Sequence, residues 1–177
     1  SAGSTTGTTS LDPTDDSVYE DDETVTVTIA GVSGGSASES GSQSVTISIL
    51  DDESVPRVSL TVSATSIAEN AGSSLTLTAT LSKTAAENVT VTLGTSGSAT
   101  EGTDYGNISD ITISAGSTTG TVSFTPTNDS TVEGNETATI AVTGVSGGSA
   151  TESGTQAETI TITDDDSGSF SVADVTV

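Results

Sequence analysis

Apolar and hydroxyl side chains alternate strictly along many short segments of this 177-residue chain. Three examples are Thr-Val-Thr-Val-Thr-Ile at 24–29, Ser-Val-Thr-Ile-Ser-Ile at 44–49 and Thr-Ile-Thr-Ile at 159–162. Because successive side chains of a β-strand point to opposite faces, a period of two gives each segment one buried β-branched face and one solvated hydroxyl face. No segment has the period of an amphipathic helix, and glycines separate the alternating segments. The pattern predicts an all-β chain folded as an Ig-like antiparallel β-sandwich.

The chain also repeats itself with a period of 113 residues. The segment Ser-Ala-Gly-Ser-Thr-Thr-Gly-Thr at 1–8 returns unchanged at 114–121, and 33 of the first 52 residues are identical to the residue 113 positions later. This period is typical of one sandwich of about seven strands, so we predict a tandem array of units. Residues 1–53 are predicted to be the C-terminal half of one unit, 54–166 a complete unit, and 167–177 the first strand of a following unit.

Most acidic residues of the complete unit fall in loops that this topology places at one pole. The alternation predicts strands at 58–66, 73–82, 88–94, 110–114, 120–126, 137–143 and 157–163. In an antiparallel sandwich, the loops after the first, third and fifth strands meet at the end of the last strand. Ten acids are predicted at this pole: Glu69, Glu101, Asp104, Asp110, Asp129, Glu133, Glu136, Asp164, Asp165 and Asp166. Glu87 and Glu152 are predicted at the opposite pole, and Glu158 on the last strand.

Charge and composition restrict what can bind to such a chain. The formal net charge is −23, with 25 acidic residues, two basic residues, no His and no Cys. This charge repels nucleic acid and anionic lipid, and we find no apolar run long enough for membrane insertion. Without imidazole or thiol groups, a bound metal must accept oxygen ligands, which favours Ca²⁺ or Mg²⁺.

Clustered carboxylates need a compensating charge. Two carboxylates about 5 Å apart repel by roughly 3 kcal/mol at an effective dielectric constant near 20. Convergent acidic loops supply the six to eight oxygen ligands that Ca²⁺ prefers, so we expect bound Ca²⁺ at the acidic pole. The alternative is that these acids only solubilise a surface rich in threonine and valine.

Four motifs of the complete unit, in this order, resemble the Calx-β domain, a Ca²⁺-binding sandwich of sodium–calcium exchangers that is also repeated in large bacterial surface proteins. They are Ser-Ile-Ala-Glu-Asn-Ala-Gly at 66–72, Gly-Ser-Ala-Thr-Glu-Gly-Thr-Asp-Tyr at 97–105, Asn-Asp-Ser-Thr-Val-Glu-Gly-Asn-Glu at 128–136 and the three aspartates at 164–166. The resemblance implies a set of Ca²⁺ ligands in the complete unit: Glu69, Asp104, Asn128, Asp129, Glu133, Glu136, Asp164, Asp165 and Asp166. The corresponding ligands of the half unit are Asp15, Asp16, Glu20, Glu23, Asp51, Asp52 and Glu53. Asn128 stands where the exchanger pattern has an acid, so the ligand there is neutral.

The function expected from these features is structural. We predict a Ca²⁺-binding repeat of a long extracellular stalk, adhesin or filament on a bacterial cell surface, in which Ca²⁺ stiffens the junctions between units. Its partners are then neighbouring repeats of the same chain or filament, with a surface or carbohydrate target as a further possibility. One alternative is a Ca²⁺ sensor domain of a membrane transporter. Another is a module that recognises carbohydrate or protein through the opposite pole, at 83–87 and 145–154.

Catalysis is not expected. Paired carboxylates also occur in glycosidases. Here they lie in loops without a nearby aromatic platform for a sugar, and the four aromatic residues are predicted to be core or corner residues: Tyr19, Tyr105, Phe124 and Phe170.

Overall fold

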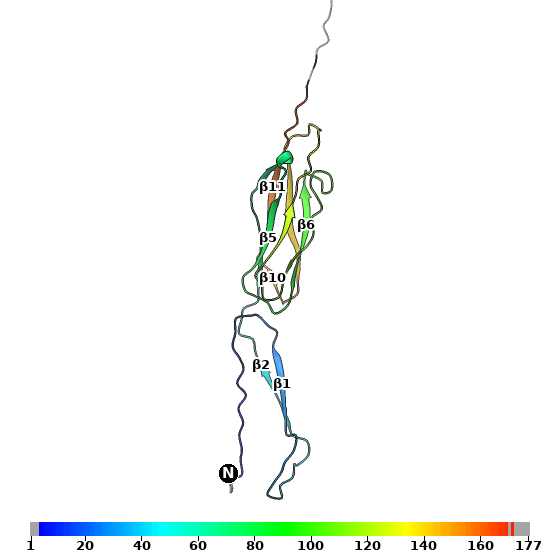
Figure 1. Cartoon of the computed structure of the whole chain (residues 1–177). Coiled ribbons are helices and arrows are strands. Elements are labelled where there is room, and N and C mark those ends of the chain that lie inside the picture. Colours follow the sequence, from blue (N-terminus) through cyan, green and yellow to red (C-terminus); the bar gives the residue numbers. More distant parts are fainter. Residues whose placement is uncertain (1–3, 170, 172–177) are drawn as a thin grey trace, which may run out of the picture.

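The computed structural model describes residues 4–169 and residue 171. In this part of the chain, a complete sandwich and a separate hairpin lie end to end (Figure 1). No helix in the described residues has the length and apolar character needed to cross a membrane. The all-β prediction is confirmed.

Two sheets form the sandwich of the complete unit. The four-stranded sheet has the order β10-β3-β5-β8 and the five-stranded sheet the order β4-β11-β9-β6-β7. The first sheet contains β3 (Arg57–Val62), β5 (Leu75–Leu81), β8 (Thr119–Phe124) and β10 (Thr151–Glu152). The second contains β4 (Ser66–Ala68), β6 (Val89–Gly97), β7 (Ile111–Ile113), β9 (Glu136–Ser146) and β11 (Ala157–Thr163).

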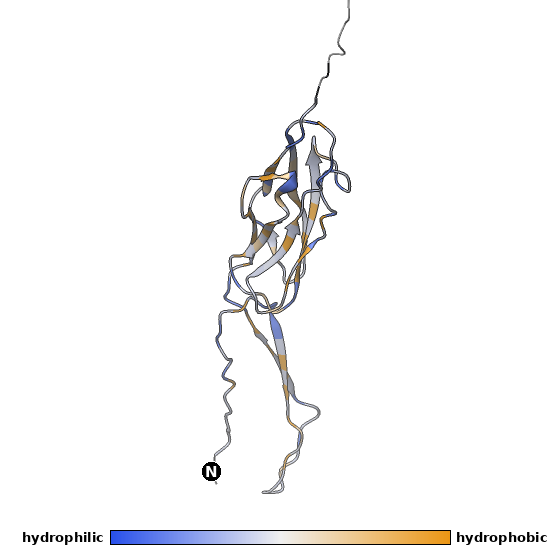
Figure 2. Ribbon diagram, turned by 45° about the horizontal axis from the view of Figure 1, so that its top comes forward, coloured by the Kyte–Doolittle hydropathy of each residue, from blue (hydrophilic) through white to orange (hydrophobic). Residues whose placement is uncertain are grey.

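The alternating residues make the core, as their period requires. Leu77 and Ala79 on β5 face Ile140 on β9 and Ile160 on β11, and all four are fully buried. The hydroxyl residues between them are directed away from this core. Figure 2 shows the resulting alternation of apolar and polar positions along the strands.

The predicted strand at 58–66 is wrong as a single element. It is divided into β3 and β4, which belong to different sheets. The chain crosses the sandwich after Val62, so that Ile67 packs into the core from the opposite sheet. β4 runs parallel to β11, and β10 runs parallel to β3, so the sandwich is not purely antiparallel. One 3₁₀ turn, η1 (Glu69–Ala71), follows β4.

The half unit forms only a hairpin of β1 (Glu23–Thr28) and β2 (Ser44–Ile49). Its register matches that of β9 and β11 in the complete unit. Thr26 pairs with Thr46, and their hydroxyl oxygens are 3.0 Å apart. The equivalent pair, Thr139 and Thr159, has hydroxyl oxygens 2.9 Å apart. A third strand, at the counterpart of β8 (residues 6–11), is absent from the described residues. Since β8 pairs with β5 in the complete unit, and residues 1–53 contain no counterpart of β5, the segment 6–11 lacks a ladder to join.

The predicted strand of a following unit, at 167–177, lies largely outside the described residues. Those that are described, 167–169 and 171, are not part of a strand.

Candidate metal centre

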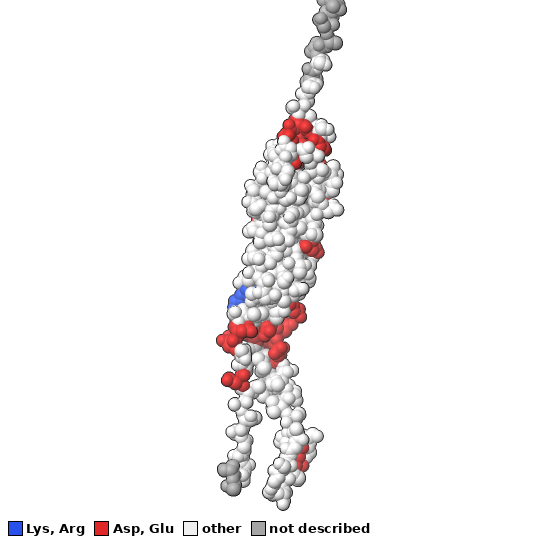
Figure 3. Space-filling model, viewed as in Figure 1, with Lys and Arg blue, Asp and Glu red and all other residues white. Residues whose placement is uncertain are grey.

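The parallel pairing of β4 and β11 brings two acidic segments together at one end of the sandwich. Ala68 is the partner of Thr163, so Glu69 and Asp164 directly follow the ends of neighbouring strands. Glu69, Asp164 and Asp166 each offer a carboxylate oxygen, and these three oxygens lie within 4.8 Å of one another. Figure 3 shows acidic residues gathered at this end of the complete unit.

Glu69 is the buried member of this first cluster. Its side chain is only 8% exposed, and its Oε1 atom has no hydrogen-bond partner. The Oδ2 atom of Asp166 is also buried and unpaired. Burial, followed by the charges of Asp164 and Asp166, raises the pKa of Glu69 above its ordinary value. Unpaired buried carboxylate oxygens are costly unless a cation meets them.

Asp164 has the opposite electrostatic setting. Its Oδ2 atom accepts hydrogen bonds from the backbone N–H groups of Glu133 (3.2 Å) and Gly134 (2.9 Å), and its Oδ1 atom accepts one from Asp166 (3.1 Å). These bonds lower the pKa of Asp164, so this carboxylate stays ionised. They also fix the loop before β9 against the end of β11.

A second cluster lies beside the first. Asp104, Glu133 and Glu136 have carboxylate oxygens within 4.8 Å of one another. Burial, together with the nearby charges of Asp129 and Asp104, raises the pKa of Glu133. Burial and the neighbouring Asp104 likewise raise the pKa of Glu136.

Tyr105 positions the loop that carries Asp104. Its ring is buried and stacks on Phe124 with the ring centroids 4.8 Å apart. The N–H of Thr127 donates to the carbonyl oxygen of Asp104 (2.9 Å), which ties this loop to the segment after β8. Tyr105 and Phe124, predicted to be core or corner residues, are core residues, whereas Phe170 lies outside the described residues.

Both clusters fit a hard divalent cation. Ca²⁺ binds oxygen at about 2.3–2.6 Å, so ligand oxygens up to about 5 Å apart can contact one ion. Each cluster contributes three carboxylates within this limit. Further oxygen ligands would come from backbone carbonyls and water.

The remaining predicted ligands of the complete unit lie around these clusters. The Oδ1 atom of Asp129 accepts the N–H of Thr131 (2.6 Å), and the side-chain amide of Asn128 donates to the carbonyl oxygen of Asp129 (3.3 Å). Asp165 accepts a hydrogen bond from the side-chain amide of Asn70. Asn70 is not among the site residues predicted from the sequence, although its position next to Glu69 in a matching motif was a usable signal.

Two of the ten acids predicted at the pole have other partners. Glu101 accepts hydrogen bonds from the backbone of Ile108 (2.6 Å) and the hydroxyl of Thr95 (2.9 Å). Asp110 accepts the N–H of Leu93 (3.1 Å), at the irregularity in the β6–β9 pairing. Both carboxylates therefore satisfy backbone groups of their own region and belong to neither cluster.

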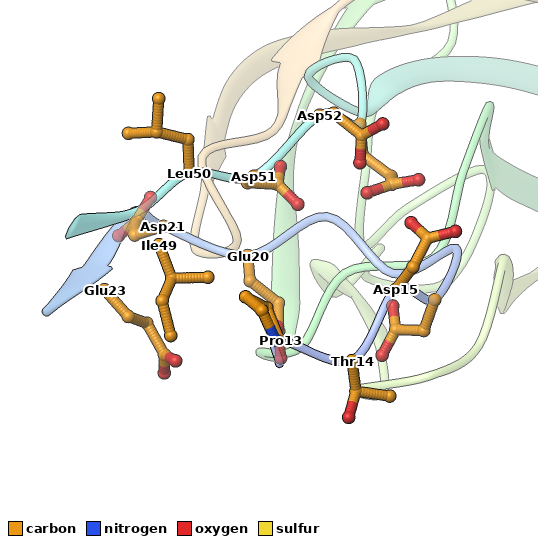
Figure 4. Close-up of a pocket in the computed structure, with 12 residues that line it drawn as sticks. Pro13, Thr14, Asp15, Glu20, Asp21, Glu23, Ile49, Leu50, Asp51 and Asp52 are labelled. Carbon is orange, nitrogen blue, oxygen red and sulfur yellow. The ribbon is translucent and has the colours of Figure 1, made fainter. Parts of the chain in front are cut away.

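The seven predicted ligands of the half unit line one cleft, of about 160 Å³, at the junction with the complete unit. Figure 4 shows Asp51 and Asp52, which follow β2, across this space from Asp15. The Oδ2 atom of Asp51 is buried and unpaired. In the described part of the half unit, no three carboxylates have oxygens within 4.8 Å of one another, as they do in the complete unit. Each cluster of the complete unit includes Glu69 or Asp104, and residues 1–53 have no counterpart of either residue.

Comparison with known proteins gives one family. The Calx-beta domain profile matches residues 1–53 and 51–166. A search of curated proteins found no match. The solved structures similar to this chain include the apo form of the Calx CBD1 domain, with a TM-score of 0.51 and 19% identity over 62% of this chain and 99% of that one. They also include CBD12 from CALX1.2, with a TM-score of 0.53 and 20% identity over 62% of this chain and 44% of that one.

At these identities the two solved structures support the fold, a β-sandwich, whereas the family match extends over nearly the whole chain. The chain belongs to the Calx-beta domain family.

Proposed function

We propose that this chain is a structural Ca²⁺-binding repeat of an extracellular stalk, adhesin or filament on a bacterial cell surface, in which Ca²⁺ stiffens the junctions between units. The observation that supports this most is the set of unpaired buried oxygens on Glu69 and Asp166 beside the ionised Asp164. Such oxygens are suited to a cation, or to a proton where no cation is bound. The proposed ligands of the complete unit are the members of the two clusters, together with the neutral Asn128 and the acids Asp129 and Asp165 around them.

The link to stiffness follows from where the acids lie in the chain. Asp51, Asp52 and Glu53 are separated from β3 by only three residues, the last of which, Pro56, is fully buried. A cation held by these acids and by Asp15 and Asp16 would fix the segment that connects the two units. Neighbouring repeats are therefore the proposed partners.

A Ca²⁺ sensor of a transporter is the second candidate, because the similar solved structures include the Calx CBD1 domain and CBD12 from CALX1.2. Affinity separates the two functions. Sensors bind Ca²⁺ with dissociation constants of about 10⁻⁷–10⁻⁵ M, and extracellular modules with about 10⁻⁴–10⁻³ M. Calorimetric titration that gives the weaker range supports the structural role, and the tighter range supports the sensor.

Thermal denaturation tests whether cations occupy the sites. At Ca²⁺ concentrations about 10- to 100-fold above the dissociation constant, each site adds roughly 1.4–2.7 kcal/mol to the free energy of unfolding. Chelation should therefore lower the Tm. A melting curve that chelator and added Ca²⁺ leave unchanged would refute the proposal.

A further inference from the structure

The half unit is docked on the complete unit through main-chain hydrogen bonds. The N–H of Tyr19 donates to the carbonyl oxygen of Thr84 (3.1 Å), and the N–H of Ala86 donates to the carbonyl oxygen of Tyr19 (3.2 Å). These bonds make Tyr19 and Ala85 partners in an isolated parallel β-bridge. The hydroxyl of Ser149 also donates to Asp21 (3.2 Å). We call the receiving surface, formed by residues 82–88 and 147–149, the base of the unit.

The base carries one positive charge, on Lys83, and one negative charge, on Glu87, and it faces the acids of the half unit. Arg57 and Lys83 are the only basic residues of the chain. Burial and the charge of Asp52 raise the pKa of Glu53. The positive charge of Lys83, which belongs to the base, acts against this rise. Figure 3 shows the basic side chains directly beside the belt of acids at the junction. Lys83 thus places the one positive charge of the base where the preceding unit concentrates negative charge.

The far end of the complete unit has the counterpart of this docking loop. The period of 113 residues aligns Val132 with Tyr19 and Asp129 with Asp16. The turns match: Asp16 accepts the N–H of Val18 (2.8 Å) as Asp129 accepts the N–H of Thr131 (2.6 Å). Tyr19, however, is half-buried by the base, whereas Val132 is 56% exposed and its backbone has no hydrogen-bond partner among the described residues.

We infer that the loop 130–134 docks on the base of a following copy of the repeat unit, through a β-bridge made by Val132 as Tyr19 makes one with Ala85. The bridge uses only backbone groups, so the replacement of Tyr19 by Val132 preserves it. Gly134 stands in the place of Asp21, so the hydrogen bond to the Ser149 hydroxyl is lost, and Val132 has a smaller side chain than Tyr19 to pack on the base. This inference rests on the tandem-array part of the proposed function and is independent of Ca²⁺ binding.

An extended chain tests the inference. A second copy of residues 54–166 replaces residues 167–177, so that it follows Asp166 as the first copy follows Glu53, the residue 113 positions earlier. Amide hydrogen exchange is then followed residue by residue by NMR in the original and extended chains. We expect the N–H of Val132 to exchange at least about tenfold more slowly in the extended chain. The N–H of Tyr19, protected in both chains, is the internal reference, and protection of the added β5 shows that the added unit folds.

The charge contribution is tested on the added base. Lys83→Glu in the added unit should reduce the protection of Val132, and the matched variant Lys83→Arg should preserve it. Equal exchange of Val132 in the original and extended chains, with the added core protected, would overturn the inference. Each measurement is repeated in chelator and in Ca²⁺: docking without Ca²⁺ binding refutes only the proposed metal site, and Ca²⁺ binding without docking refutes only this inference.

Discussion

The surroundings of the Glu69 carboxylate disfavour its negative charge. It is buried, one of its oxygens is unpaired, and Asp164 and Asp166 lie within reach of the same ion. In the absence of a cation, this arrangement destabilises the folded chain, because the ionised side chain has lost water and gained two like charges. With a cation, the same arrangement is a pre-formed ligand set.

Glu69→Gln should therefore have two opposite effects. In chelator, the free energy of unfolding should rise, because a buried charge is removed. Ca²⁺ affinity should fall by at least about tenfold, which corresponds to about 1.4 kcal/mol, because a charged ligand is lost. Chemical denaturation and calorimetric titration measure the two effects. The matched control is Glu158→Gln on β11, outside both clusters, which should change neither quantity. A metal-free protein that Glu69→Gln destabilises would contradict the argument.

Asp165→Ala and Asp129→Ala are also expected to weaken Ca²⁺ binding, since each removes a charge next to the clusters. Glu87 is not a suitable control residue for these two variants. It lies at the opposite pole from the clusters, as predicted, but it borders the same hollow as Glu20, Asp21 and Asp22 of the half unit. Titration calorimetry in which Glu158→Gln weakens binding as much as Asp165→Ala does would show that general charge, rather than position, governs binding.

The pH dependence of stability has a defined sign. Five carboxyl groups have a raised pKa, chiefly because of burial and then of neighbouring acids: Glu53, Glu69, Glu133, Glu136 and Asp166. Between its ordinary and raised pKa, such a group binds more protons in the folded chain than in the unfolded chain, so the free energy of unfolding falls as pH rises. Asp164 has a lowered pKa and acts oppositely, but only as pH falls below its ordinary value of 3.8.

The metal-free protein should therefore have a higher Tm near about pH 5 than near about pH 7. In saturating Ca²⁺ this difference should shrink or reverse, because the ion binds the deprotonated groups. Glu69→Gln should flatten the metal-free profile, and Glu158→Gln should leave it unchanged. A metal-free Tm that rises steadily from pH 5 to pH 7 would be the opposite result.

At the scale of elements, alternation was sufficient to predict most strands. It identified β5, β11 and the first part of β9, where the apolar residues keep one phase, but not the end of β9 beyond residue 143, where the β6–β9 pairing is irregular. It failed at 58–66, where the chain changes sheets, because Val58, Leu60 and Ile67 are all apolar core residues and their spacing does not reveal which sheet each one joins.

The same limit applies to the site. Loop positions predicted an acidic pole, but the meeting of Glu69 with Asp164 depends on the parallel pairing of β4 and β11, which alternation does not encode. For the same reason, the sequence did not distinguish Glu101 and Asp110, whose partners are local N–H groups, from the acids that form the clusters.

Two equivalent glycines provide a test of the packing between elements. A Cβ atom at Gly120 on β8 would lie 2.6 Å from the carbonyl oxygen of Thr112 and 2.8 Å from a methyl group of Ile111 on β7. Gly7, its counterpart in the half unit, has nothing within 4 Å. We expect Gly120→Ala to destabilise the complete unit by about 1–3 kcal/mol, through overpacking. Gly7→Ala should change stability by less than about 0.5 kcal/mol. Urea denaturation that gives equal losses would show that the half unit is packed in the same way as the complete unit.

At the scale of the whole molecule, the half unit and the complete unit differ in how well they bury the apolar side chains at equivalent positions. Val27 on β1 is 39% exposed, whereas its counterpart Ile140 is fully buried beneath the four-stranded sheet. Ile47 on β2 is exposed where Ile160 is fully buried. A two-stranded hairpin with an open apolar face is marginal in water and prone to pair with other chains. The sheet that covers these residues in the complete unit is β10-β3-β5-β8, and residues 1–53 contain no counterparts of β3 and β5.

An in-register fusion tests this complementarity. Residues 54–113 are placed directly before Ser1, so that the repeat continues without a gap, since Ser1 corresponds to Ser114. The amides of Val27 and Ile47 should become as protected from exchange as those of Ile140 and Ile160, and binding of a hydrophobic dye should fall. The urea m-value should rise, because m scales with the surface exposed on unfolding. A control fusion in which Leu77 and Val89 of the added segment are replaced by aspartate should give none of these changes, because it cannot form a core. If the intact and control fusions leave the hairpin equally open, the apolar face of β1 and β2 does not require the first half of a unit, and the half unit must be stabilised in another way.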